Sequence, residues 1–185
     1  MNNLSKYEDR LTAHTQSVVA HQRAETLACL NKKNVLELCV GPSLKVLQDA
    51  YSKVGVSVTG NDIEQRWKKF YPEGKWLIGD CFNIDWTPFD AIVFAPPLSK
   101  GCSGRREDSL MIEQVTPSYY DFLKKLNPRQ SACLVLPARC IATKQDRIQY
   151  HRLLSYLWNN GFQFQIKEMK DSKQIRKYVD VYISK

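Results

Sequence analysis

Long apolar runs are missing from this sequence. No stretch approaches the roughly 20 apolar residues that an α-helix needs to span a bilayer, and residues 1–14 hold no apolar segment of the kind that an export signal requires. Glycine and proline are also scarce, at eight each among 185 residues, which argues against a fibrous or low-complexity chain. These absences predict a cytoplasmic protein that does not interact with membranes.

The sequence also lacks the spacing of a metal or disulfide site. Its six cysteines form no Cys-x-x-Cys pair, and most of them lie among apolar neighbours, as reduced thiols do in cytoplasmic proteins. His14 and His21 lie seven residues apart, without an acidic or cysteine partner at ligand spacing. We therefore expect no metal centre.

The chain length allows one complete core and is too short for two ordinary domains. We expect a single domain over 1–185, with a helical segment at 1–33 and the core at 34–185.

Charge is divided unequally: residues 1–98 hold 11 Lys/Arg and 11 Asp/Glu, whereas residues 99–185 hold 16 Lys/Arg and 8 Asp/Glu. The net charge of +8 therefore lies in the second half, which suits either a phosphate-rich partner or a solvated surface.

Strand and helix signals alternate along the chain. Short apolar runs that end at turn residues predict strands at 34–40, 56–60, 76–78, 89–95 and 132–136. Helices are predicted at 5–31, 44–54, 64–70, 118–126 and 145–160. Two last segments, 162–166 and 178–183, alternate with period two and predict an antiparallel hairpin. The pattern predicts a three-layer α/β fold, with a mostly parallel seven-stranded sheet and helices on both faces.

Polar and small residues terminate the predicted strands. Ligands of open α/β sheets bind outside the carboxyl ends of the strands, so these residues mark the candidate site. The four strand ends are Glu37 with Cys39-Val40-Gly41-Pro42, Asn61-Asp62, Gly79-Asp80-Cys81, and Ala95-Pro96-Pro97-Leu98. An acid at the second strand end can accept both hydroxyls of a ribose, and a turn of small residues lets a ligand approach backbone N–H groups. The pattern predicts a site for a nucleoside.

The order of these motifs resembles that of the class I S-adenosylmethionine-dependent methyltransferases, over residues 34–185. The resemblance implies a Rossmann-like sheet, S-adenosyl-L-methionine as cofactor and S-adenosyl-L-homocysteine as product. Only Gly41 of the family's three motif glycines is present, with Cys39 and Ser43 in the other two places. By this resemblance Asp62 binds the ribose, and Asp80 with Cys81 contacts the adenine. The implied cofactor-binding residues are Glu37, Cys39, Gly41, Ser43, Asp62, Ile63, Asp80 and Cys81.

The fourth strand end carries the clue to the methyl acceptor. Ala95-Pro96-Pro97-Leu98 resembles the Asn/Asp-Pro-Pro-aromatic motif of enzymes that methylate amino groups of bases. In those enzymes the first side chain and the next backbone carbonyl orient the amino group, so catalysis is mostly positioning. Ala95 has no side-chain acceptor, which leaves backbone carbonyls and the hydroxyl of Ser99 for this role. Phe94 or the pair Tyr119-Tyr120 would supply a stacking ring in place of Leu98.

The segment that follows is predicted to bind the acceptor. Residues 98–117 form the longest irregular stretch, and such loops in compact domains are usually functional. Arg105 and Arg106 suit bidentate contacts with phosphate, so the predicted acceptor is a nucleic acid, RNA more than DNA. The predicted catalytic residues are Ala95, Pro96, Pro97 and Ser99, and the predicted substrate-binding residues are Leu98, Lys100, Arg105 and Arg106.

Other interpretations of the sequence stay open. Ala95 and the missing glycines also fit a methyltransferase-like module that binds nucleic acid or a partner subunit without transferring a methyl group. A protein or small-molecule acceptor, and a homodimer, fit as well. Cys140 lies roughly where RNA cytosine-carbon methyltransferases keep their nucleophile. A nicotinamide-dependent oxidoreductase is disfavoured because the Gly-x-Gly-x-x-Gly turn is absent.

Overall fold

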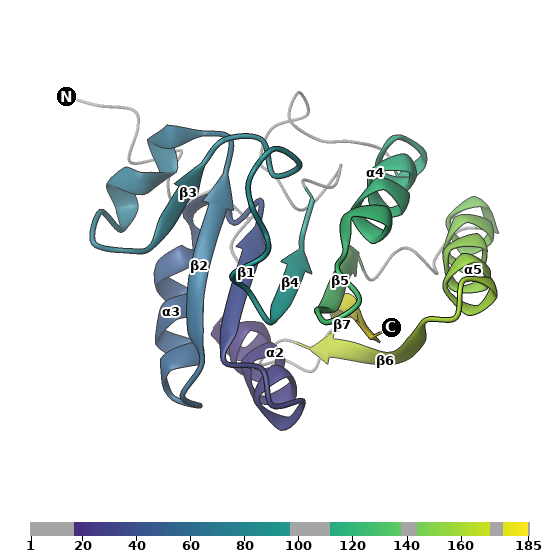
Figure 1. The fold of residues 1–185 in the computed structure, drawn as a ribbon, viewed down its shortest axis with the longest axis horizontal. Coiled ribbons are helices and arrows are strands. Elements are labelled where there is room, and N and C mark those ends of the chain that lie inside the picture. The colour runs from purple at the N-terminus through teal and green to yellow at the C-terminus, as the bar shows by residue number, and fades with distance from the viewer. Residues whose placement is uncertain (1–16, 97–111, 138–143, 171–175, 185) are drawn as a thin grey trace.

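The strands form a single mixed sheet (Figure 1). The computed structural model describes residues 17–96, 112–137, 144–170 and 176–184. Within these ranges the strands are β1 (Asn34–Leu38), β2 (Ser57–Asp62), β3 (Trp76–Ile78), β4 (Ala91–Phe94), β5 (Ser131–Pro137), β6 (Gln163–Lys170) and β7 (Arg176–Ser184). Their order in the sheet is β3-β2-β1-β4-β5-β7-β6. Strands β1 to β5 pair in parallel and β7 pairs antiparallel with β5 and β6, which confirms the predicted α/β fold with its closing hairpin.

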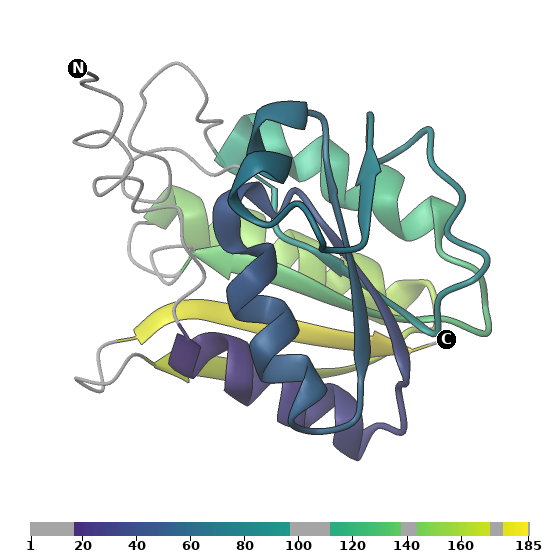
Figure 2. The ribbon, with the colours of Figure 1, turned by 90° about the vertical axis from the view of Figure 1, so that its left-hand side faces the viewer.

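Helices cover both faces of the sheet. Helices α2 (Ser17–Cys29) and α3 (Leu44–Ser52) lie along one face (Figure 2), and α4 (Ile112–Lys125) and α5 (Lys144–Asn159) pack against the other. Two short 3₁₀ helices, η1 (Gly41–Ser43) and η2 (Gln65–Phe70), follow β1 and β2. None of the helices in the described ranges combines the length and the apolar character needed to cross a membrane.

Strand β1 divides its side chains between two cores. Leu36 and Leu38 belong to the apolar cluster beneath α4 and α5, and Val35 belongs to the cluster beneath α2 and α3. Both faces of the strand are therefore buried, which explains why β1 reads as a nearly continuous apolar run. The same alternation in β7 places Val179 and Val181 in the first cluster and Asp180 on the α2 and α3 side.

Helix α4 begins at Ile112, whereas the sequence predicts an irregular segment as far as Pro117. The irregular segment was therefore predicted to end too late in the chain. Proline has no N–H to donate and is disfavoured inside a helix, yet α4 continues through Pro117. The packing of α4 outweighs the missing hydrogen bond, since Tyr119, Phe122 and Leu123 are buried in the core.

The strand order reverses between β1 and β4. From β1 the chain proceeds outward to β2 and β3, and it then returns to β4 on the other side of β1. In open α/β sheets the ligand site lies at such a reversal, outside the carboxyl ends of the strands. This edge of the sheet lies at the top of Figure 1.

Candidate functional site at the carboxyl edge of the sheet

The turn after β1 combines one strained residue with one glycine. Cys39 has a φ of +60°, in the left-handed region that costs a residue with a Cβ atom roughly 1–2 kcal/mol. Gly41 has a φ of +54°, which glycine adopts at little cost. A Cβ atom added at Gly41 would have no described atom within 4 Å. A ligand can therefore approach the backbone at Gly41.

Asp62 joins the ends of β1 and β2. One carboxylate oxygen, Oδ2, accepts a hydrogen bond from the Gly41 N–H at 2.8 Å, and Oδ1 accepts one from the Glu64 N–H at 2.9 Å. The side chain is buried, and this burial raises the pKa of Asp62, while the two backbone donors oppose the rise. The structure thus brings Asp62 and Gly41, two predicted site residues, into direct contact.

Asn61 fixes the end of β3 against β2. Its side-chain amide donates hydrogen bonds to the backbone oxygens of Leu77 and Gly79, both at 2.9 Å. Gly79 in turn donates its N–H to the Asp62 backbone oxygen at 3.0 Å, and its φ of +143° is one that glycine adopts readily. Asn61 was noted as part of the second strand end but was not assigned to the cofactor or the acceptor. Its contacts were not predicted because both partners lie at the end of β3, 16 and 18 positions away.

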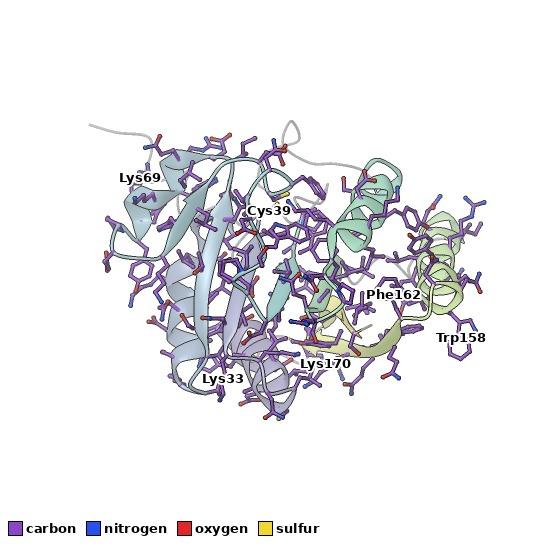
Figure 3. All side chains as sticks on the ribbon, in the orientation of Figure 1. Lys33, Cys39, Lys69, Trp158, Phe162 and Lys170 are labelled. Carbon is purple, nitrogen blue, oxygen red and sulfur yellow. The ribbon has the colours of Figure 1, made fainter. Side chains whose placement is uncertain are left out.

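Two thiols meet at the same edge. Cys39, labelled in Figure 3, shares a hydrogen bond with Cys81 at the start of the loop after β3. This bond, together with burial, raises the pKa of Cys39, and it lowers the pKa of Cys81. Both cysteines are free thiols. Within the described ranges, no three His, Cys, Asp or Glu side chains gather in a way that could hold a metal ion.

The loop from Asp80 to Trp86 is held from two sides. The Asp80 carboxylate accepts the Phe82 N–H at 2.9 Å, and the Trp86 ring N–H donates to the Cys81 backbone oxygen at 2.9 Å. From α4, the Lys125 ammonium group donates to the backbone oxygens of Phe82 and Ile84 and lies 4.6 Å from the centre of the Trp86 ring. Lys125 was missed from the sequence because it lies more than 40 residues from the loop that it holds.

Two isoleucine side chains are exposed at the ends of β2 and β3. Ile63 is 70% exposed and Ile78 is 40% exposed. Ile63 directly follows Asp62, and Asp62 pairs with Ile78 in the sheet. Exposed branched aliphatic side chains at adjoining strand ends would gain from contact with a flat apolar group. Ile63 was among the predicted residues and Ile78 was not.

The end of β4 differs in part from expectation. Ala95 is half-buried and Pro96 is buried. Phe94 stacks on Phe122 at 5.0 Å between ring centres, and its ring and that of Tyr119 are 2% and 1% exposed. Phe94 and Tyr119 therefore cannot supply the predicted stacking ring, because both belong to the core. Tyr120, the third ring of that prediction, is half-buried and packs edge-on against Tyr156 at 4.7 Å between ring centres. The other predicted residues of this segment lie outside the described residues: Pro97, Leu98, Ser99, Lys100, Arg105, Arg106, and Cys140 of the alternative.

Glu37 and Ser43 lie below the edge rather than at it. The Glu37 side chain is 2% exposed and faces α2 and α3, where its Oε1 accepts a hydrogen bond from the Tyr51 hydroxyl at 2.5 Å. Burial raises the pKa of Glu37, against the effects of Arg23 and Tyr51. Ser43 is 1% exposed. In this structure the Glu37 carboxylate contacts Tyr51 and Arg23, and its contact with a cofactor stays a prediction, as does that of Ser43.

Neither a family model nor a curated protein matches the chain. Solved structures do match its fold. A candidate RNA methyltransferase from Pyrococcus horikoshii is 16% identical with a TM-score of 0.57, over 90% of this chain and 83% of that one. A glycopeptide N-methyltransferase, MtfA, was solved with S-adenosylmethionine. It is 14% identical with a TM-score of 0.58, over 89% of this chain and 93% of that one.

A third match is the plantazolicin methyltransferase BpumL, solved with S-adenosylhomocysteine and a substrate analogue. It is 12% identical with a TM-score of 0.61, over 97% of this chain and 88% of that one. Three methyltransferases named for different substrates thus share one architecture with this chain. This chain has the fold of the class I S-adenosylmethionine-dependent methyltransferases.

Proposed function

We propose that this protein is an S-adenosylmethionine-dependent methyltransferase whose cofactor binds across the carboxyl ends of β1, β2 and β3. The observation that carries the proposal is the Asp62 carboxylate, which bridges the turn after β1 and the end of β2 at 2.8 and 2.9 Å. An acid in this place suits the two hydroxyls of a ribose. The fold supports the same assignment.

The residues at this edge fit the cofactor. The spaces beside Gly41 and Gly79 hold no described atom within 4 Å of an added Cβ, so both backbones are open to close approach. The side chains of Ile63 and Ile78 offer apolar contact for an adenine ring, and Asp80 and Cys81 follow Ile78 after Gly79. The residues proposed to hold the cofactor are Cys39, Gly41, Asp62, Ile63, Ile78, Asp80 and Cys81.

Positioning is the chemical task that remains for this chain. The bound cofactor supplies a sulfonium methyl group that is already activated for transfer. The backbone carbonyls of Ala95 and Pro96, at the end of β4, would accept hydrogen bonds from an acceptor amino group and orient its lone pair. We propose a nucleic acid as the acceptor, RNA more than DNA, with Ser99, Lys100, Arg105 and Arg106 in contact with it.

A methyltransferase-like module without transfer activity is the second candidate. Two observations favour it: Ala95 has no side-chain acceptor, and Cys39 takes a left-handed conformation where the family has glycine. A protein or small-molecule acceptor is the third. The three candidates differ in what the purified chain binds and modifies.

Calorimetric titration with S-adenosylmethionine, S-adenosylhomocysteine and NAD tests the proposal. We expect micromolar binding of the first two and none of NAD, followed by transfer of a labelled methyl group to an RNA pool. Cofactor binding without transfer to RNA, DNA or protein pools would support the module. No binding of either S-adenosyl compound would overturn the proposal.

Changing Lys125 to methionine should weaken cofactor binding by about fivefold. The ammonium group holds two carbonyls of the 80–86 loop, and a net hydrogen bond contributes about 1 kcal/mol. The neighbouring Lys124 gives a matched control, because it is exposed and pairs with Asp121 in its own helix, at 3.3 Å. Calorimetry on both variants checks this: equal affinities would mean that Lys125 does not position the loop.

A further inference from the structure

A basic and aromatic segment adjoins the candidate cofactor site. The 3₁₀ helix η2 begins three positions after Asp62 and contacts η1, the turn that contains Gly41. Its six residues include three cations and two aromatic rings, and no acid. None of these residues is buried. We call Arg66, Trp67, Lys68, Lys69 and Phe70 the η2 surface.

The rings and the cations of the η2 surface are arranged in pairs. The Arg66 guanidinium lies 4.6 Å from the centre of the Trp67 ring, and the Lys69 ammonium lies 4.9 Å from the centre of the Phe70 ring. The two ring centres are 5.9 Å apart. Cations near ring faces are attracted by the ring quadrupole. The Arg66 guanidinium also pairs with the Glu64 carboxylate at 3.0 Å, just before the segment. With Lys68 and Lys69, the segment presents π-systems and net positive charge together, on a part of the chain that adds no buried side chain to the core.

This combination is the one that single-stranded nucleic acids require. Unpaired bases stack on aromatic side chains, and Lys and Arg neutralise the adjoining phosphates. An acidic protein would use the charges but would gain less from the half-buried Trp67 ring and the exposed Phe70 ring beside them. Duplexes keep their base faces stacked, so they offer only phosphates to such a surface.

The η2 surface also lies where such a strand would be useful. In Figure 3, Lys69 lies at the same upper edge of the molecule as Cys39, whereas Lys33 and Lys170 lie at the opposite edge. A strand bound at η2 would therefore lie near the carboxyl ends of the sheet strands, where the cofactor site is proposed.

We infer that the η2 surface binds a single-stranded segment of nucleic acid, by stacking of bases on Trp67 and Phe70 and by phosphate contacts with Arg66, Lys68 and Lys69. The inference deepens the proposed function and rests on it only for the role of the strand as methyl acceptor. Binding itself requires no cofactor, so the two proposals can fail separately.

Fluorescence anisotropy with labelled oligonucleotides of about 15 nucleotides tests the inference, with one sequence as single-stranded RNA, as single-stranded DNA and as duplex. We expect both single strands to bind more tightly than the duplex at moderate salt. Trp67→Ala and Phe70→Ala should each weaken binding of the single strands by about tenfold, and Trp67→Phe should retain most of it.

Charge is tested with two matched double variants. Lys68→Glu with Lys69→Glu should weaken binding and flatten the dependence of log K on log salt by about 1 to 2. Lys33→Glu with Lys170→Glu changes the net charge equally at the opposite edge and should leave the salt dependence close to that of the unchanged chain. Equal losses in both double variants would overturn the inference, because they would report net charge alone.

Three further outcomes would also overturn it. One is unchanged binding in Trp67→Ala and Phe70→Ala, provided that thermal melts show both variants folded. Another is equal or tighter binding of polyglutamate, which would indicate an acidic protein partner. The last is no binding of any oligonucleotide by a chain that binds S-adenosylmethionine, which would leave the proposed cofactor site intact. Oligonucleotide binding by a chain that binds no S-adenosyl compound would support the surface while the proposed function fails.

Discussion

Replacing Arg23 by methionine is expected to lower the free energy of unfolding by about 3–5 kcal/mol. The Arg23 Nε and Nη2 atoms donate to the two Asp180 oxygens at 2.7 and 3.1 Å, and Nη1 lies 3.6 Å from Glu37 Oε1. The three side chains are 1%, 0% and 2% exposed. Without the guanidinium, two carboxylates would remain buried with no cation between them, which is the costly way to break a buried ion pair.

The melting temperature of the Arg23→Met variant should fall by roughly 10 °C, since 1 kcal/mol corresponds to about 2–4 °C in a chain of this size. The control combines Arg23→Met with Glu37→Gln and Asp180→Asn, which removes all three charges and should recover most of the loss. If Arg23→Met alone had the same melting temperature as the unchanged chain, the role assigned to this cluster would be wrong.

The same cluster predicts that the free energy of unfolding depends on pH. Burial raises the pKa of Glu37 above its ordinary value, so the folded chain holds this proton at a pH where the unfolded chain releases it. The contribution of Glu37 to stability is therefore complete below the ordinary pKa and is lost as pH rises through the raised value. The penalty of Arg23→Met should accordingly be larger at neutral than at mildly acidic pH, and melts at both values measure it.

Changing Asp62 to alanine should weaken S-adenosylmethionine binding by about 1–3 kcal/mol, which is about 5- to 150-fold in Kd. The change removes the acceptor for a ribose and also leaves the Gly41 and Glu64 N–H groups without their present partner. Calorimetric titration gives the affinity, and a thermal melt of the same sample separates this loss from unfolding.

Two further variants make the Asp62 experiment specific. Asp49→Ala removes an exposed acid on α3 that pairs with Lys45 and should leave affinity unchanged. Asp62→Asn keeps the shape but not the charge, and its affinity should not vary with pH. In the unchanged chain, affinity should decline as pH falls through the raised pKa of Asp62, because the protonated acid loses an acceptor. Equal affinities for Asp62→Ala and Asp49→Ala would place the cofactor elsewhere.

The parts of the fold that local patterns determine were predicted well. Strands β1 to β5 lie at the predicted segments. For β1 and β4 the reason is that strands buried on both faces need apolar runs. Alternation predicted the β6 and β7 hairpin, although β6 continues to Lys170, beyond the predicted end at 166. Because Asp62 and Gly41 follow parallel strands, they were predicted to lie at one edge of the sheet. Their hydrogen bond was not predicted.

Residues that act across long sequence separations were not predicted. Arg23 and Asp180 lie 157 positions apart, and no pattern within either segment indicates their pairing. Lys125 and Asn61 have ordinary polar neighbours, and only the packing of α4 and β3 gives them partners. Glu37 was assigned to the cofactor because the motif contains an acid. Its register beside Leu36 and Leu38 puts it on the opposite face from theirs, toward α2 and α3, where it became part of the core.

The conformation of Cys39 has a consequence for how this chain can change over generations. Every cysteine codon becomes a glycine codon through one nucleotide substitution, so the residue that suits a φ of +60° is a single step away. That step would relieve the backbone of roughly 1–2 kcal/mol. It would also remove a thiol that packs against the apolar cluster beneath α4 and α5 and shares a hydrogen bond with Cys81. At position 39, glycine therefore gives the less strained backbone and cysteine gives the better-packed interior, and a single nucleotide change exchanges one for the other.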